Sequence, residues 1–132
     1  MKKIAIAAAL LSLVSTAQAQ EKLPVVATFS ILGDIVANVG GDRVAVKSLV
    51  GPNGDAHVYS PSPADAKTLT DAKVVFTNGL GFEGWIGRLI KSSNTKAPNV
   101  VAAKGVKLRK LADAHGHSHG DGDPHAWQSV PN

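Results

Sequence analysis

Cysteine is absent from this sequence of 132 residues. Without thiols, the chain has no disulfide framework, thiolate zinc site, iron–sulfur cluster, catalytic thiol or lipid-bearing cysteine. Aromatic residues are scarce, at 5%, and basic residues form no stripe with interleaved aromatics, so nothing indicates nucleic-acid binding. Apolar residues nevertheless make up 44% of the chain, which is typical of a globular protein, and the length fits one domain.

Long apolar runs are also lacking, and the longest one lies at the N-terminus. Lys2 and Lys3 precede the apolar stretch Ile4–Val14, and Ala17-Gln18-Ala19 follows it. A membrane-spanning helix needs about 20 apolar residues. A basic start, a short apolar core and small residues at the end are instead typical of a secretory signal peptide. Residues 1–19 are therefore predicted to be a signal peptide, and the mature protein is expected in a bacterial periplasm.

Beyond residue 20, strand and helix patterns alternate. Ser30 and Ser62 are the expected caps of the first two helices, and Asp65 completes a capping-box pattern with Ser62. The order βαβαβαβ predicts an α/β fold, a four-stranded parallel sheet flanked by helices, with ligands beyond the carboxyl ends of the strands. Apolar runs predict strands at 24–30, 44–50, 73–78 and 99–102, and helical spacing predicts helices over 31–39, 62–72 and 82–90.

All five histidines fall in the predicted loops after the second and fourth strands. His57 lies in the turn-rich loop Gly51–Pro61, and the other four are His115, His117, His119 and His125. The tract at 112–124 is polar and rich in glycine, so core packing does not explain its histidines. Imidazole is the commonest metal ligand, and clustered histidines favour Zn²⁺. His115, His117 and His119 are predicted to be auxiliary zinc ligands, the alternative being a solvated linker.

The motif Asp123-Pro124-His125-Ala126-Trp127 differs from this tract because proline restrains it. Pro124 fixes its own φ and favours an extended Asp123, which holds His125 in one direction, and Trp127 can pack behind it. A preorganised histidine suits a tight metal site, although a turn histidine without a ligand is the alternative. A parallel sheet would bring His57 and His125 to the same edge.

Three stretches together resemble the zinc/manganese solute-binding proteins of bacterial metal ABC importers, and specifically their N-terminal lobe. The stretches are Gly51–Asp65, Asn78–Trp85 and Asp123–Trp127. The resemblance implies two α/β lobes joined by a long helix, with the metal held between them and delivered to a membrane permease. It also implies that His57 and His125 are metal ligands, that the His-rich loop is the one found in zinc members, and that further ligands belong to a second lobe.

This interpretation divides the chain into a signal peptide (1–19), an α/β lobe (20–111), a His-rich loop (112–124) and the start of an inter-lobe segment (125–132). Zn²⁺ is preferred over Mn²⁺, which favours oxygen ligands. No enzymatic activity is expected, because no H-E-x-x-H motif is present and nothing marks Glu83 as a general base. The protein is also expected to be a monomer. The alternative function is a stand-alone periplasmic zinc buffer or chaperone that uses the His-rich tract.

Overall fold

The computed structural model describes residues 20–107 and 122–129. The predicted signal peptide and the auxiliary residues His115, His117 and His119 lie outside these ranges, so their predicted roles are not tested by the structure. Within the described part, none of the helices has the length and apolar character needed to cross a membrane.

The predicted four-stranded parallel sheet is confirmed. Its strand order is β2-β1-β3-β4, and each neighbouring pair is parallel. Along the chain the elements are β1 (Leu23–Phe29), α1 (Ser30–Gly40), β2 (Val44–Val50), α2 (Pro63–Asp71), β3 (Val74–Thr77), α3 (Ile86–Ser93) and β4 (Asn99–Val101), with short 3₁₀ helices η1 (Gly41–Arg43) and η2 (Ala126–Gln128).

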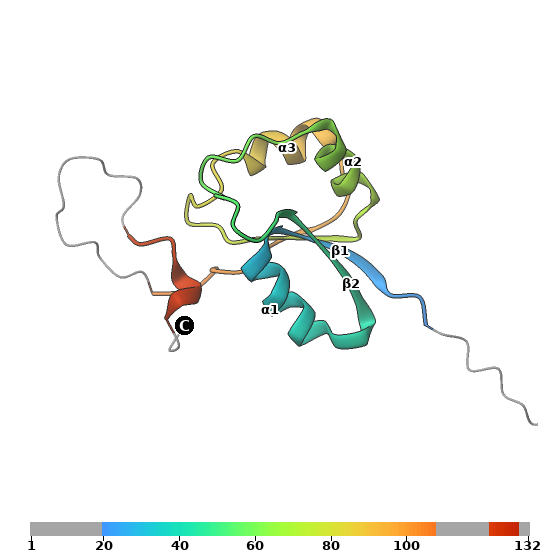
Figure 1. Ribbon diagram of the computed structural model, residues 1–132, viewed down its shortest axis with the longest axis horizontal. Coiled ribbons are helices and arrows are strands. Elements are labelled where there is room, and N and C mark those ends of the chain that lie inside the picture. The colour runs from blue at the N-terminus through green and yellow to red at the C-terminus, as the bar shows by residue number, and fades with distance from the viewer. Residues whose placement is uncertain (1–19, 108–121, 130–132) are drawn as a thin grey trace, which may run out of the picture.

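The helices cover the sheet from both sides. Figure 1 shows α1 on one face and α2 and α3 on the other. Strand β1, one of the two interior strands, is buried from Val25 to Phe29, as expected for a strand covered on both faces, and Thr28 is the one polar residue in this run. Leu32 of α1, Leu69 of α2 and Leu89 of α3 pack into the same core.

The predicted N-terminal cap is correct for α2 but not for α1. Helix α2 begins as predicted: the Ser62 side chain accepts a hydrogen bond from the Asp65 N–H, and the Asp65 carboxylate accepts one from the Ser62 N–H. The predicted Ser30 cap is wrong. Strand β1 runs directly into α1, so the cap position falls on Phe29 and Ser30 is already helical.

Helix α3 begins at Ile86 rather than at Phe82. Gly79, Leu80 and Gly81 have positive φ angles, of 86°, 57° and 74°, which place turns ahead of the helix. Phe82 and Trp85 are nevertheless buried, at 5% and 4% exposure. The helical spacing of Phe82 and Trp85 therefore predicted their burial correctly, but it wrongly placed them inside the helix.

Candidate metal site

His57 and His125 meet at the carboxyl edge of the sheet, although 68 residues separate them in the sequence. Their Nε2 atoms are 3.1 Å apart and their ring centroids 5.2 Å apart. Two imidazoles on one tetrahedral Zn²⁺, each at about 2.0–2.1 Å, would have their nitrogens roughly 3.3 Å apart. The two rings therefore lie as close together as predicted, while their role as metal ligands stays a prediction.

The turn around His125 fixes the direction of its imidazole. The Asp123 carboxylate accepts hydrogen bonds from the His125 backbone N–H, at 3.0 Å, and from its Nδ1, at 2.7 Å. Because an ionised carboxylate only accepts hydrogen bonds, Nδ1 is the donor in this contact, and the tautomer that the bond favours has its lone pair on Nε2, the atom that faces His57. Trp127 packs against the ring as predicted, with centroids 5.3 Å apart.

Two hydrogen bonds hold the loop that carries His57. The His57 N–H donates to Asp55 Oδ1 at 2.8 Å, which forms a turn closed by a side chain. The indole N–H of Trp85 donates to the carbonyl of Ala56 at 2.7 Å. The residue just before His57 is therefore attached to the segment between β3 and α3.

Tyr59 ties the other end of this loop to α2. Its ring packs on Trp85, and its hydroxyl donates to Asp65 Oδ2 at 3.0 Å. Burial and the hydrogen bond to Asp65 raise the pKa of Tyr59. Burial would also raise the pKa of Asp65, but hydrogen bonds from Ser62 and Tyr59 outweigh it, so the Asp65 pKa lies below its ordinary value.

Phe82 forms the apolar floor beneath both imidazoles. Its ring centroid lies 4.4 Å from that of His57 and 5.5 Å from that of His125. It also contacts Phe29 and Trp127, at 5.0 and 4.7 Å. Both imidazoles therefore pack against a buried aromatic side chain, which limits their movement toward the core.

Two polar residues under the site, Asn78 and Glu83, were not among the site residues predicted from the sequence, and they are 4% and 5% exposed. Glu83 accepts hydrogen bonds from the backbone N–H groups of Asn78 and Gly79 and from the Thr28 hydroxyl. The Asn78 amide donates to the carbonyl of Pro124 at 2.9 Å. Both lie in one of the stretches that carried the family resemblance, yet nothing local in the sequence distinguishes a buried asparagine or glutamate from a solvated one.

Gly79, between these two residues, is restricted to glycine for two reasons. Its φ of 86° lies in the left-handed region, and a Cβ there would come within 2.4 Å of Val101 Cγ1. The turn at Gly79 therefore packs closely against β4.

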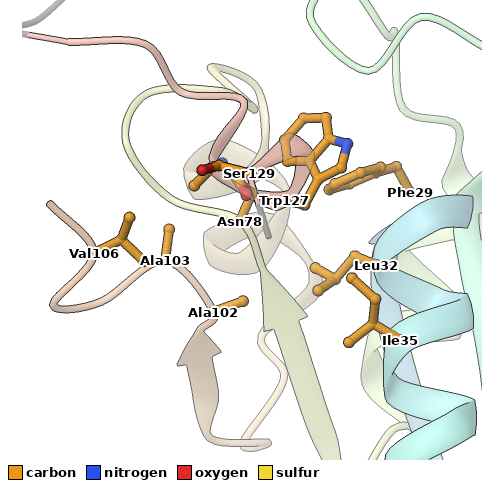
Figure 2. Close-up of a pocket in the computed structure, with 10 residues that line it drawn as sticks. Phe29, Leu32, Ile35, Asn78, Ala102, Ala103, Val106, Trp127 and Ser129 are labelled. Carbon is orange, nitrogen blue, oxygen red and sulfur yellow. The ribbon is translucent and has the colours of Figure 1, made fainter. Parts of the chain in front are cut away.

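A hollow of about 370 Å³ opens beside the site, between α1 and the segment after β4. In Figure 2, Leu32 and Ile35 line it on one side and Val106 and Ala103 on the other, with Trp127 and Phe29 close together near its upper end. The hollow is mainly apolar and contains neither imidazole, so it is not the metal site itself.

The described residues hold no group of three or more histidine or acidic side chains placed to bind one ion. The two imidazoles are thus the ligand set that these ranges can offer, and a tetrahedral site needs further ligands from elsewhere.

Comparison with known proteins places this geometry in context. A family model described as zinc-uptake complex component A, periplasmic (ZnuA), matches residues 25–132. The manganese-binding lipoprotein MntA of Halalkalibacterium halodurans is 39% identical over 118 residues, which cover 89% of this chain and 37% of that protein. The manganese ABC transporter substrate-binding lipoprotein PsaA of Streptococcus pneumoniae is 36% identical over 125 residues, covering 89% and 39%.

Solved structures of periplasmic metal-binding proteins are also similar to this chain. The Mn-bound periplasmic metal binding protein from Candidatus Liberibacter asiaticus superposes with a TM-score of 0.71 at 29% identity, covering 83% of this chain and 40% of that one. The chain thus spans about two fifths of the length of these relatives.

Proposed function

Since the chain belongs to the ZnuA family, we propose that it is the N-terminal lobe of the substrate-binding component of a metal ABC importer. Its task is to capture a divalent cation outside the cytoplasm and deliver it to a membrane permease, without catalysing a reaction. The observation that carries the proposal is the 3.1 Å separation of the Nε2 atoms of His57 and His125.

The cation proposed is Zn²⁺. Both ligands of this lobe are imidazole nitrogens, for which Zn²⁺ has higher affinity than Mn²⁺ in the general order of divalent metals. The names of MntA and PsaA refer to manganese, so Mn²⁺ is the competing cargo to test. The oxygen or nitrogen character of the remaining ligands, which residues 20–107 and 122–129 do not supply, would tune the preference further.

Asp123 supports this role as an outer-shell partner of the metal. A carboxylate bonded to the far nitrogen of a ligating imidazole fixes its tautomer and makes it a better donor. Binding requires neutral imidazoles, so the affinity should fall as the pH drops through the range where histidine gains a proton. His115, His117 and His119 are proposed as auxiliary ligands that bind zinc weakly.

The proposal is tested by zinc titration in competition with a chromophoric chelator. His57→Ala and His125→Ala should each weaken the tightest site by at least about tenfold, because each removes one of two fixed ligands. Replacing His115, His117 and His119 together by Ser should lower the number of weakly bound ions and leave the tightest site unchanged. Circular dichroism checks that each variant stays folded.

The opposite pattern would contradict the proposal. If both alanine variants titrate like the parent while the triple serine variant loses its tight binding, the His-rich tract is the principal site. The chain would then act as a stand-alone zinc buffer. Tighter binding of Mn²⁺ than of Zn²⁺ in the same assay would overturn the choice of cargo alone.

A further inference from the structure

The segment between β3 and α3, residues 78–85, reaches both histidine loops. Two of its side chains, Asn78 and Trp85, form hydrogen bonds to the backbone of these loops and not to the imidazoles themselves. We propose that Asn78 and Trp85 are positioning residues that hold His57 and His125 at the separation one metal ion requires. This inference rests on the proposed function and adds to it a pair of residues that set the geometry of the ligands.

Trp85 holds the first loop. Its indole N–H donates to the carbonyl of Ala56, and this bond joins two buried residues, at 4% and 5% exposure. The carbonyl belongs to the residue immediately before His57, so the bond fixes the backbone from which the His57 side chain projects. A bond at this depth competes little with water and restrains the loop strongly.

Asn78 holds the second loop. Its amide donates to the Pro124 carbonyl at 2.9 Å and to the Gly79 carbonyl at 3.0 Å. Pro124 immediately precedes His125, so the two loops are held in the same manner, each through the carbonyl one residue before its histidine. Asn78 and Trp85 thus give one short segment a hold on both ligands.

Glu83 makes this segment a rigid reference. Its Oε1 accepts hydrogen bonds from the Asn78 N–H and from the hydroxyl of Thr28, which is completely buried in the central strand. Its Oε2 accepts from the Gly79 N–H. The carboxylate therefore links the segment to the core strand β1, and the loops are positioned relative to the core.

The geometric tolerance explains why such a device is needed. Ligands must lie within about 0.5 Å of their productive positions for tight binding. His57 is exposed, His125 only half-buried, and their loops are 68 residues apart along the chain, so local turn structure does not fix one ring relative to the other. The two hydrogen bonds from residues 78–85 supply that relation.

The test uses Asn78→Asp, which keeps the side-chain shape and removes the N–H donors, and Trp85→Phe, which removes the indole donor and keeps an aromatic ring. Two controls match them. Asn38→Asp removes an amide that donates to the Asp34 carbonyl on the solvent-exposed side of α1. Val36→Ala opens a core cavity in α1 and reports what general destabilisation does by itself.

The first measurement needs no metal. In the parent, an NOE between the imidazole protons of His57 and His125 should be observed. It should persist in both controls and weaken or vanish in Asn78→Asp and Trp85→Phe. An NOE of parent intensity in both folded variants overturns the positioning role, whatever the chain does with zinc.

The second measurement is the affinity for Zn²⁺, with Co²⁺ absorption as a signature of coordination geometry. Each positioning variant should bind Zn²⁺ about tenfold more weakly and show an altered Co²⁺ spectrum, whereas the controls should match the parent. Parent-like affinity and spectra in both variants would overturn the inference while leaving the proposed function intact. Failure of the proposed function has a different pattern, in which His57→Ala and His125→Ala leave the tightest site unchanged.

Discussion

Glu83 shows how a single carboxylate can be structural although its sequence context allows other roles. Its two oxygens accept from Asn78, Gly79 and Thr28, and the side chain is 5% exposed. A general base needs a free lone pair that faces a substrate, whereas these oxygens face the chain's own donors. The geometry therefore favours a structural role, in which Glu83 holds the segment under the candidate metal site in place.

Truncation of Glu83 should be costly for stability. Glu83→Ala leaves two buried donors, the Asn78 N–H and the Thr28 hydroxyl, without their acceptor, and it also removes the acceptor of the half-buried Gly79 N–H. Each buried donor left without a partner costs about 1–3 kcal/mol. We expect the free energy of unfolding to fall by about 3 kcal/mol or more, measured by urea denaturation. Glu21→Ala, which changes the other glutamate of the chain at an exposed position, is the control, and its free energy of unfolding should stay within about 0.5 kcal/mol of the parent. A loss below about 1 kcal/mol for Glu83→Ala would mean that water replaces the missing carboxylate.

At the scale of elements, α2 is the helix whose start was best specified by its own residues. Ser62, Pro63 and Asp65 occupy the cap, the first helical position and the third, and both capping-box hydrogen bonds form. Asp65 also accepts from the Tyr59 hydroxyl, which joins the helix start to the loop of His57. The start of α2 and the loop that carries His57 are thus stabilised by the same carboxylate.

The lowered pKa of Asp65 leads to a pH-dependent contribution to stability. The ionised carboxylate is favoured in the folded state, so its contribution is complete above the ordinary carboxyl pKa of about 4 and is lost as the pH falls through the lowered value. Asp65→Asn should therefore be less stable than the parent by about 1 kcal/mol at pH 7, and the gap should shrink below about pH 4.

Urea denaturation of parent and variant between pH 7 and pH 2.5 measures this gap. Lys67→Gln removes the partner of an exposed ion pair on the same helix, with Asp71 at 2.8 Å, and serves as the control. Surface pairs of this kind contribute little, so its difference from the parent should be small throughout. A gap for Asp65→Asn that stays constant or grows toward acid would contradict the assignment.

At the scale of the whole molecule, the described residues bring two proposed ligands, His57 and His125, together at one edge of the sheet, and the chain spans about two fifths of the length of its relatives. Two imidazoles hold a cation less tightly than a full set of ligands. We therefore expect zinc affinity measured on this chain to be a lower bound for any longer protein that contains the same lobe.

Export is the second prediction for the whole molecule. Ala17-Gln18-Ala19 is the expected cleavage site, so protein recovered from the periplasm should begin at Gln20, as intact-mass measurement would show. Ala19→Leu places a bulky residue where a small one is required and should retain the leader. A periplasmic mass that includes Met1–Ala19 in the parent would overturn the predicted leader.

Local sequence determined the order of the elements, the four strands and the capping box of α2. These features depend on residue spacing and on hydrogen bonds between near neighbours, which a sequence displays directly. Placement of His57 and His125 at one edge also followed, because parallel strands bring their carboxyl ends together.

Only the tertiary structure decided what supports those histidines. The Thr28–Glu83 and Asn78–Pro124 hydrogen bonds join residues 55 and 46 positions apart, and Phe82 reaches the imidazoles from a turn that its spacing had assigned to a helix. Such contacts depend on how strand ends and loops pack against one another, and no periodic pattern encodes them. The burial of Glu83 and Asn78 follows from that packing, because the same two residue types would be solvated in an exposed loop.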